Sequence, residues 1–417
     1  MDPIASLHAT PKAWLLSSVL APHAAAFASH LREGRYSSNT RCSYFGSIAH
    51  LARWMTHCCL PLRLLDESAV ERFLVRHVPH CDCPRPVVRT RSALRAACAH
   101  LLHVLREQRV IADRTPATGP IADELRRYDE HMRDVRGLTE GTRSGRLRIV
   151  QRLLLHKFAD GPVVIAELQA DDVRQFIAAQ LDLRGTTSNA TTLASALRAY
   201  LRYRTTCGER VHALLGVIAS PAHWSLGSLP RALKPSEVKR LLRSFIGSLP
   251  SPRRGYAIVR CALDLGLRSS EVAQLQLTDI DWLAGTVTIK RTKSRREDVL
   301  PLLALTGRAL VDYLRYERPQ TTNPAVFVRR RAPRDQPIGV DAVRRVIRDA
   351  YRRIGLTHGR THALRHTLAC RLLDHGSSLK EVADVLRHRS LNTSLIYAKL
   401  DHPRLAAVAL PWPGSAT

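Results

Sequence analysis

Residues 361–373 read THALRHTLACRLL and place His362, Arg365 and His366 at helical spacing. Residues three and four apart share one face of an α-helix, so these side chains are expected to point the same way. Two histidines four apart also occur in zinc proteases, but that motif needs a glutamate after the first histidine, where this chain has Ala363. A guanidinium beside the ligands would also repel a dication. The remaining alternatives are a site for an anion, which suits arginine together with histidine, and a basic surface helix.

The charge balance of the whole chain favours the anion. Its 417 residues include 64 Lys and Arg against 36 Asp and Glu, a formal net charge of +28. The positive charge is spread along the chain, so it is not a detachable basic tail. A globular chain this basic is expected to act on a polyanion, with nucleic acid as the first candidate and an anionic membrane surface as the second. No apolar run is long enough to span a membrane.

The cysteines indicate where the protein works. There are nine, an odd number scattered along the chain, which fits the reducing cytoplasm. The segment HVPHCDC (77–83), with His57, Cys58 and Cys59 upstream, gathers metal-ligand types. Its spacings match none of the standard zinc fingers, so buried thiols and loop histidines are the favoured interpretation and zinc the alternative.

The N-terminal half contains an internal repeat. SALRA occurs at 92–96 and again at 195–199, 103 residues later, and similar segments precede each copy in the same order. Each copy has apolar residues at three- and four-residue steps, which predicts short amphipathic helices. A period this long indicates a duplicated helical domain rather than a solenoid.

A division into domains follows from this repeat and from Pro- and Gly-rich segments. We expect an N-terminal tail (1–19), an additional helical domain (20–113), a second helical domain (118–216), a linker (217–235) and a C-terminal domain (236–417). The last is predicted to be helical near 305–318, 339–354, 361–375 and 378–387. TVTIKRT (286–292) and EDVLPLL (297–303) interrupt the helices as a hairpin.

Basic and ring-bearing residues recur along the C-terminal domain in an order that suits phosphoryl chemistry. They are Arg268, Lys293, His362, Arg365, His388 and Tyr397. Arginines can neutralise a pentacoordinate phosphorus, lysine and histidine can transfer protons, and tyrosine can supply a nucleophile. Taken singly, Arg268 could be a surface residue paired with Glu271, and Tyr397 a core tyrosine. Asp279 and Asp281 in LTDID are more simply structural than a metal pair.

These residues resemble the signature of the tyrosine recombinases, the phage integrase family, which is Arg, Lys, His-x-x-Arg, His and Tyr in that order. The phrases LGLRSSEVAQLQLTDIDW (265–282), TKSRREDVLPL (292–302), HALRHTLACRLL (362–373) and TSLIYAK (393–399) are similar to the family's own. One departure is Arg387, where the family usually has glycine before His388, and this could alter the turn that carries His388.

The resemblance implies a mainly α fold, with helical SAM-like N-terminal domains and an α-rich catalytic domain that contains a small antiparallel sheet. It implies a site-specific DNA recombinase or integrase that works through a 3′-phosphotyrosine on Tyr397. Arg268 and Arg365 would bind the phosphate, Lys293 would be the general acid, and His362 and His388 would assist. Glu271 and His366 would support these residues. No metal, cofactor or ATP is expected, and the chain has no GK[ST] phosphate loop.

The resemblance also implies partners. Double-stranded DNA is the expected substrate, clamped between the catalytic domain and the 118–216 domain, and a homo-oligomer, a tetramer on DNA, is the expected assembly. Other recombinases of the same transposable element are further candidate partners. The apolar segment DHPRLAAVALPWP (401–413) is expected to pack onto a neighbouring protomer. Two rival functions stay open: a catalytically silent DNA-binding protein of the same fold, and a type IB topoisomerase.

Overall fold

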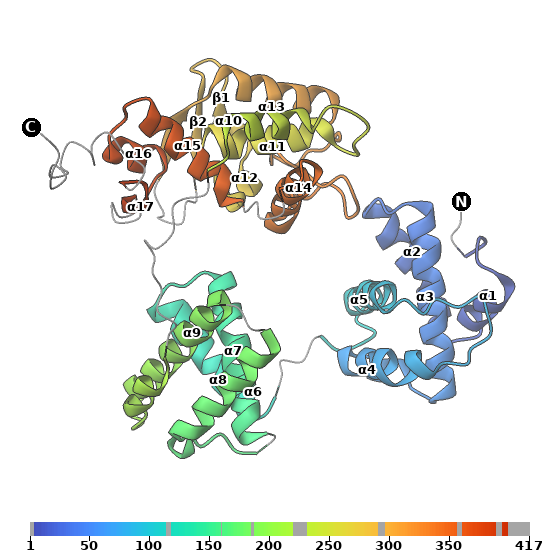
Figure 1. The fold of residues 1–417 in the computed structure, drawn as a ribbon. Coiled ribbons are helices and arrows are strands. Elements are labelled where there is room, and N and C mark those ends of the chain that lie inside the picture. The colour runs from blue at the N-terminus through green and yellow to red at the C-terminus, as the bar shows by residue number, and fades with distance from the viewer. Residues whose placement is uncertain are drawn as a thin grey trace, which may run out of the picture. The chain divides into compact units, whose positions relative to one another are not determined.

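A computed structural model describes residues 4–113, 118–159, 161–184, 187–219, 232–290, 297–356, 361–388 and 394–398. The chain divides into two compact units, Ala112–Trp224 and the remainder, Met1–Ile111 with Ser225–Thr417. The described residues are mostly helical with one small antiparallel sheet, which confirms the predicted fold class (Figure 1). Within this part of the chain, no helix is both long and apolar enough to cross a membrane.

The N-terminal module is a bundle of helices around one apolar core. Its helices are α1 (Ala9–Leu16), α2 (Ala24–Glu33), α3 (Ser38–His57), α4 (Glu67–Arg72), which continues into a π-helical turn (Phe73–His77), and α5 (Arg91–Glu107). Leu15 of α1 is fully buried in this core, together with Phe45 and Leu94. The prediction of a tail over residues 1–19 is therefore wrong for α1, whose apolar side packs against α3.

The second unit repeats this arrangement. It contains α6 (Pro120–Glu130), a π-helical turn (His131–Val135), α7 (Glu140–Phe158), α8 (Ala170–Arg184) and α9 (Thr187–Thr206). The internal repeat is visible in the cores, since Phe73 of the first copy and Phe176 of the second, 103 positions on, are both buried. Four helices therefore follow in the same order in each module, α2 to α5 and α6 to α9, whereas α1 has no counterpart among the described residues of the second unit.

The C-terminal part builds its core around the buried helix α11 (Pro252–Asp264), which contacts α12, α13, α14 and α15. The helices around it are α10 (Pro235–Arg243), α12 (Ser269–Gln274), α13 (Ala304–Tyr316), α14 (Val340–Arg353), α15 (His362–Asp374), α16 (Leu379–Val385) and α17 (Leu395–Ala398). The sequence Ser-x-x-Glu at 378–381 is the pattern of a capping box, and α16 begins with one: Glu381 N–H donates to Ser378 Oγ and Ser378 N–H to the Glu381 carboxylate.

The sheet has three antiparallel strands in sequence order: β1 (Ile280–Asp281), β2 (Thr286–Ile289) and β3 (Asp298–Pro301). The predicted hairpin is β2 with β3, in which Val287 opposes Leu300 and both face the core. Asp279 accepts a hydrogen bond from the Gln276 N–H and pairs with Lys290, whereas Asp281 caps the turn at 283–284. Both aspartates therefore have the structural roles that the sequence favoured.

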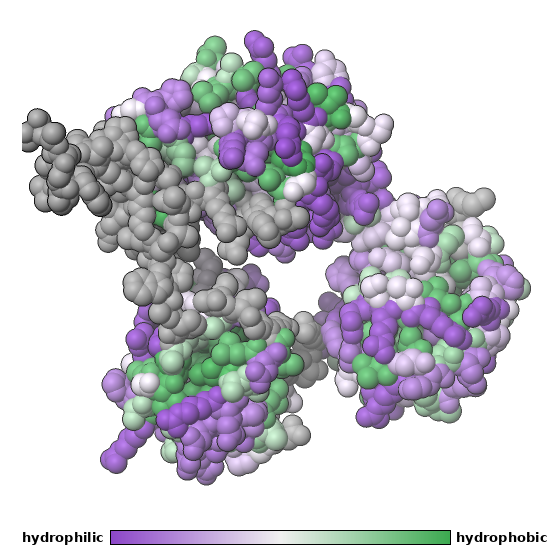
Figure 2. All heavy atoms as spheres, viewed as in Figure 1, coloured by the Kyte–Doolittle hydropathy of each residue, from purple (hydrophilic) through white to green (hydrophobic). Residues whose placement is uncertain are grey.

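The outer surface matches the charge of the sequence. Figure 2 shows hydrophilic residues over much of the drawn face of each part, with apolar areas between them.

The 112–224 unit contains a buried carboxylate. Glu124 of α6 is 1% exposed and accepts hydrogen bonds from Tyr200 Oη at 2.8 Å and Arg204 Nη1 at 3.1 Å, both on α9. This group ties the first helix of the unit to the last.

We predict that Glu124→Gln destabilises this unit by about 3 kcal/mol, because it leaves the partly buried guanidinium of Arg204 without its main counter-charge. Hydrogen–deuterium exchange of α6 and α9 peptides, measured in the full chain, should show faster exchange. The matched control is Asp123→Asn, which breaks the exposed pair with Arg126 and should change the free energy of unfolding by less than about 0.5 kcal/mol. Equal protection in the two variants would contradict the prediction.

Candidate active site

The site begins at the N-terminus of α12. Arg268 is the N-cap residue and Glu271 the third residue of the helix, and the Glu271 carboxylate accepts two hydrogen bonds from Arg268. The Arg268 N–H donates to Glu271 Oε2 at 2.8 Å, and Arg268 Nη1 donates to Glu271 Oε1 at 2.6 Å. The Glu271 side chain is 2% exposed, while that of Arg268 is 25% exposed. Glu271 therefore fixes a guanidinium that still reaches the surface.

A second guanidinium comes from α15. Arg365 is buried, and it donates hydrogen bonds to the carbonyl oxygens of Gly266 and Leu386. Burial lowers its pKa to about 9, with the positive charges of Arg268 and Arg387 adding to the effect. It stays protonated at neutral pH and joins three separate segments of the chain. Gly266 has a φ of +57°, and a Cβ there would lie 2.9 Å from Leu386 Cδ2, so this turn requires glycine.

The third guanidinium is Arg387, the residue that departs from the family pattern. It has a φ of 53°, and the bonds Arg387 N–H to Asp384 O and His388 N–H to Ala383 O close a Schellman turn after α16. The turn that glycine would make is thus kept. The Arg387 side chain is buried and Nη2 donates to Glu271 Oε2 at 2.8 Å, so one carboxylate holds two arginines.

This pairing governs the ionisation of Glu271. Burial by itself would raise the pKa of the carboxyl group. The charges of Arg387 and Arg268, with the Arg268 N–H, outweigh burial and leave the Glu271 pKa below its usual value. The carboxylate is therefore ionised at neutral pH.

Tyr397 of α17 lies against two histidines. Its hydroxyl is 2.7 Å from His366 Nδ1, and its ring is parallel to that of His388 at a centroid distance of 6.3 Å. His388 Nδ1 is in turn 2.6 Å from Ser394 Oγ, at the start of α17. Tyr397 is 2% exposed, so the phenol is enclosed.

The protonation states of these rings follow from their burial. Burial raises the pKa of Tyr397 to about 12, although the charge of Arg365 opposes it. Burial lowers the pKa of His366 and of His388 to about 4, and the nearby arginines add to this. At neutral pH the phenol is protonated and both imidazoles are neutral. A neutral imidazole hydrogen-bonded to a phenol can accept its proton.

The structure brings Arg268, Arg365, His388 and Tyr397 together, with Glu271 and His366 between them. His362 is exposed on the first turn of α15. Lys293 and the segment 401–413 lie outside the described residues. The sequence assigned His366 a supporting role, whereas here it contacts the tyrosine hydroxyl. Sequence reasoning missed Gly266 and treated Arg387 only as a departure, because their partners Arg365 and Glu271 lie far away in the chain. It also missed Ser394, whose partner His388 is only six residues away.

The zinc alternative for α15 finds no support in this geometry. Among the described residues, two groups of three or more ligand-type side chains converge, and neither includes His362 or His366. His366 Nδ1 instead lies 2.7 Å from the hydroxyl of Tyr397.

Comparison with known proteins agrees with this geometry. The phage integrase family matches residues 231–404. The protein y4rA of Sinorhizobium fredii, named as an integrase/recombinase, is 36% identical over 379 residues, 88% of each chain. The tyrosine recombinase XerC of Azotobacter vinelandii is 30% identical over 287 residues, 68% of this chain and 94% of that protein.

Two solved structures share the fold. The recombinase XerH, in a post-cleavage complex with palindromic difH, has a TM-score of 0.53 at 18% identity and covers 83% of this chain and 97% of its own. A λ integrase dimer bound to a COC′ core site has a TM-score of 0.52 at 15% identity, and the match covers 70% of this chain and 99% of that one. This chain belongs to the phage integrase family and is a tyrosine-type site-specific DNA recombinase.

Proposed function

We propose that this recombinase cuts and rejoins double-stranded DNA through a 3′-phosphotyrosine on Tyr397, without metal or ATP. The observation that supports this most directly is the enclosed phenol of Tyr397, hydrogen-bonded to a neutral imidazole beside a cluster of arginines. Arginines can do the charge neutralisation that a metal ion does in other phosphoryl transferases. The free energy of the broken phosphodiester bond is retained in the new bond between phosphorus and Tyr397.

In the first step, Tyr397 Oη attacks the scissile phosphorus and the bond from phosphorus to the 5′ oxygen breaks. The phenolic proton passes to His366 Nδ1, and the departing 5′ oxygen takes a proton from Lys293. Arg268 and Arg365 bind the non-bridging oxygens, and His388 and His362 contact the phosphate. In the second step, the 5′-hydroxyl of a partner strand attacks the phosphotyrosine and restores the phenol.

Tyr397 must leave its enclosed position to meet a phosphate. Two contacts hold its short helix: the bond from Tyr397 to His366 and the bond from Ser394 to His388. Of these two imidazoles, His388 is also proposed to contact the phosphate. An arriving phosphodiester would therefore compete with Ser394 for His388 and loosen α17, while His366 stays available to accept the phenolic proton.

The proposed partners are double-stranded DNA and further copies of this chain, four in a synapse, with other recombinases of the same element as possible additional members. The formal net charge of +28 supports DNA, because each neutralised phosphate releases a counterion. The XerH and λ integrase structures, both of the same fold, are complexes with DNA, and the latter contains a dimer.

We predict that Tyr397→Phe abolishes covalent protein–DNA adducts and leaves DNA binding within about twofold of wild type, because only the nucleophilic oxygen is removed. The probe is a set of duplexes that tile the DNA flanking the gene and carry a sulfur in place of the 5′ bridging oxygen, so that cleaved strands cannot be rejoined. Adducts are read on denaturing gels and binding by gel shift. Adducts in the variant would assign the nucleophile elsewhere. A wild type that binds but never forms adducts would indicate the catalytically silent protein.

We predict that Lys293→Ala is slow on ordinary DNA and recovers most of its cleavage rate on the sulfur-bridged duplexes. A thiol leaving group has a pKa of about 8.5 and leaves without the proton that an alkoxide needs. The loss on ordinary DNA should be about 10²- to 10⁴-fold in rate. Arg268→Ala is the comparison, because a variant that binds the phosphate poorly should cleave both ordinary and sulfur-bridged DNA slowly. An equal loss for Lys293→Ala on both substrates would refute the general-acid role.

We predict that His366→Asn lowers the cleavage rate by about 10²- to 10⁴-fold and changes its pH dependence. His366 has a pKa near 4 and is a neutral acceptor from pH 6 to 9, so it adds no inflection to the wild-type profile. The variant must use the small ionised fraction of a phenol with a raised pKa, so its rate should rise about tenfold per pH unit. His375→Asn, which changes the exposed C-cap histidine of α15, is the control. A slower variant with an unchanged profile would indicate positioning rather than proton transfer.

A further inference from the structure

Four side chains with metal-ligand atoms converge inside the N-terminal module, far along the chain from the active-site residues. They are His50 of α3, His77 at the end of the π-helical turn, and Cys81 and Cys83 in the segment that follows. Their ligand atoms all lie within 4.8 Å of one another. Cys81 and Cys83 are buried, His50 is fully buried and His77 is half-buried.

The distances between these atoms have the size of the edges of one tetrahedron. His50 Nε2 lies 3.2 Å from His77 Nε2 and 3.2 Å from Cys81 Sγ, and Cys83 Sγ lies 3.8 Å from His77 Nε2. Ligands at the usual zinc–nitrogen and zinc–sulfur distances of about 2.0 and 2.3 Å stand about 3.3 to 3.8 Å apart around a tetrahedral ion. Three of the six distances are thus close to those that a zinc ion would impose, and the remaining three are at most 4.8 Å.

Hydrogen bonds alone do not explain the two close contacts of His50 Nε2. His50 Nδ1 is 2.8 Å from the carbonyl oxygen of Val88, which can only accept, so Nδ1 carries the proton and Nε2 is a bare lone pair. That one lone pair faces both His77 Nε2 and Cys81 Sγ at 3.2 Å. It can accept one good hydrogen bond, not two. A bond from the second ring nitrogen to a backbone carbonyl is also how metal-binding histidines are usually oriented.

We propose that His50, His77, Cys81 and Cys83 bind a structural zinc ion. Two thiolates and two neutral imidazoles in tetrahedral array select zinc among the common divalent ions, and four protein ligands leave no open position for catalysis. The site carries no net charge, because the two thiolates balance the dication. The nearby guanidinium groups of Arg53 and Arg89 therefore do not repel it as they would a bare ion.

The position of the site indicates what it does. It fastens the segment between the π-helical turn and α5 to the middle of α3, where the first copy of the repeat differs from the second. The position equivalent to His50 in the second copy, 103 residues on, is Leu153, a fully buried apolar residue of α7. The second module thus fills with a leucine the core position that the first gives to a ligand.

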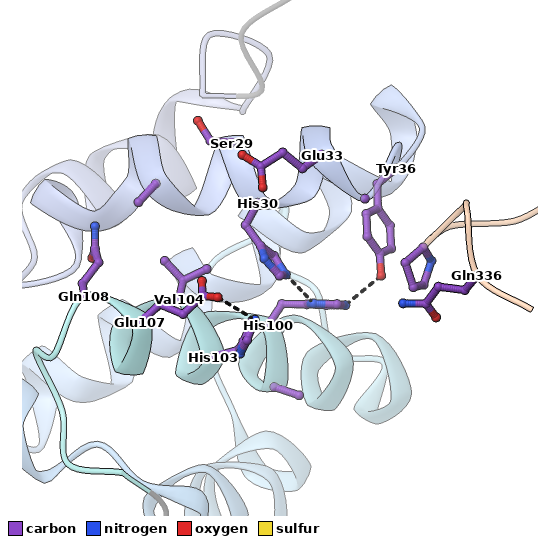
Figure 3. Close-up of a pocket in the computed structure, with 14 residues that line it drawn as sticks. Ser29, His30, Glu33, Tyr36, His100, His103, Val104, Glu107, Gln108 and Gln336 are labelled. Atoms are coloured by element: carbon purple, nitrogen blue, oxygen red, sulfur yellow. Dashed lines mark hydrogen bonds and ion pairs between the residues drawn. The ribbon is translucent and has the colours of Figure 1, made fainter. Parts of the chain in front are cut away.

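Neighbouring candidates do not share this geometry. His57, Cys58, Cys59 and His80, which the sequence placed near a possible zinc site, are exposed and outside the group. Figure 3 shows a second histidine cluster, in a pocket between α2 and α5. There His30 Nε2 bonds to His100 Nδ1 at 3.0 Å, and His100 Nε2 to Tyr36 Oη at 3.0 Å, so these ring nitrogens already satisfy one another.

The test is metal analysis of the full-length protein, purified under reducing conditions without chelator. We expect about one zinc per chain by mass spectrometry. Exchange with Co²⁺ should give the visible absorption of a tetrahedral ion and a near-ultraviolet thiolate charge-transfer band. X-ray absorption at the zinc edge should report two sulfur and two nitrogen ligands. Removal of zinc with a chelator should speed hydrogen exchange in α3 and in residues 77–90 and leave the 118–219 region unchanged.

Matched variants separate this site from adventitious binding. Cys81→Ser with Cys83→Ser should lose most of the zinc, whereas Cys58→Ser with Cys59→Ser removes two exposed thiols and should keep it. His77→Asn should lose zinc and His80→Asn should not. Wild-type protein without zinc and without the Co²⁺ bands overturns the proposal, as does a Cys81–Cys83 disulfide that survives reduction. Zinc lost from the Cys58 and Cys59 variant, but kept in the Cys81 and Cys83 variant, overturns it too.

Discussion

One buried carboxylate allows three guanidinium groups to share a small volume. Arg268, Arg365 and Arg387 would repel one another in a site with little water, and burial already lowers the pKa of Arg365. Glu271 bonds to two of them, and the carbonyl oxygens of Gly266 and Leu386 accept from the third. The balance stays positive, with three cations against one anion. This excess of positive charge suits an anionic group such as a phosphodiester.

The same contacts explain why the segments that build the site have the conformations they have. Gly266 takes a positive φ so that its carbonyl can face Arg365 and Arg387. Arg387 takes a positive φ in a Schellman turn and so delivers its own side chain to Glu271 and the next residue, His388, to the ring of Tyr397. A non-glycine residue in this conformation costs about 1–2 kcal/mol.

Local sequence patterns predicted much of this molecule. The alternation of apolar and polar residues predicts the hairpin of β2 and β3, and Ser378 with Glu381 indicates the cap of α16. The ordered family motif named Arg268, Arg365, His388 and Tyr397. What the sequence could not show depends on contacts between distant residues. No local rule pairs Arg387 with Glu271, or places His366 on the phenol. His50 is separated from His77 by a loop and a helix, and only the fold reveals that both face Cys81. The burial of Leu15 in the first module likewise depends on contacts with distant residues.

The enclosure of Tyr397 has a consequence for the cell that carries this protein. A recombinase meets far more ordinary DNA than target, and a phenol that is protonated, screened from water and bonded to a neutral imidazole has little reactivity toward a backbone encountered by chance. Fidelity would then depend less on the affinity of the chain for its own sites than on how rarely α17 releases Tyr397 on other DNA. Keeping the nucleophile enclosed would in this way limit accidental breaks in the chromosome.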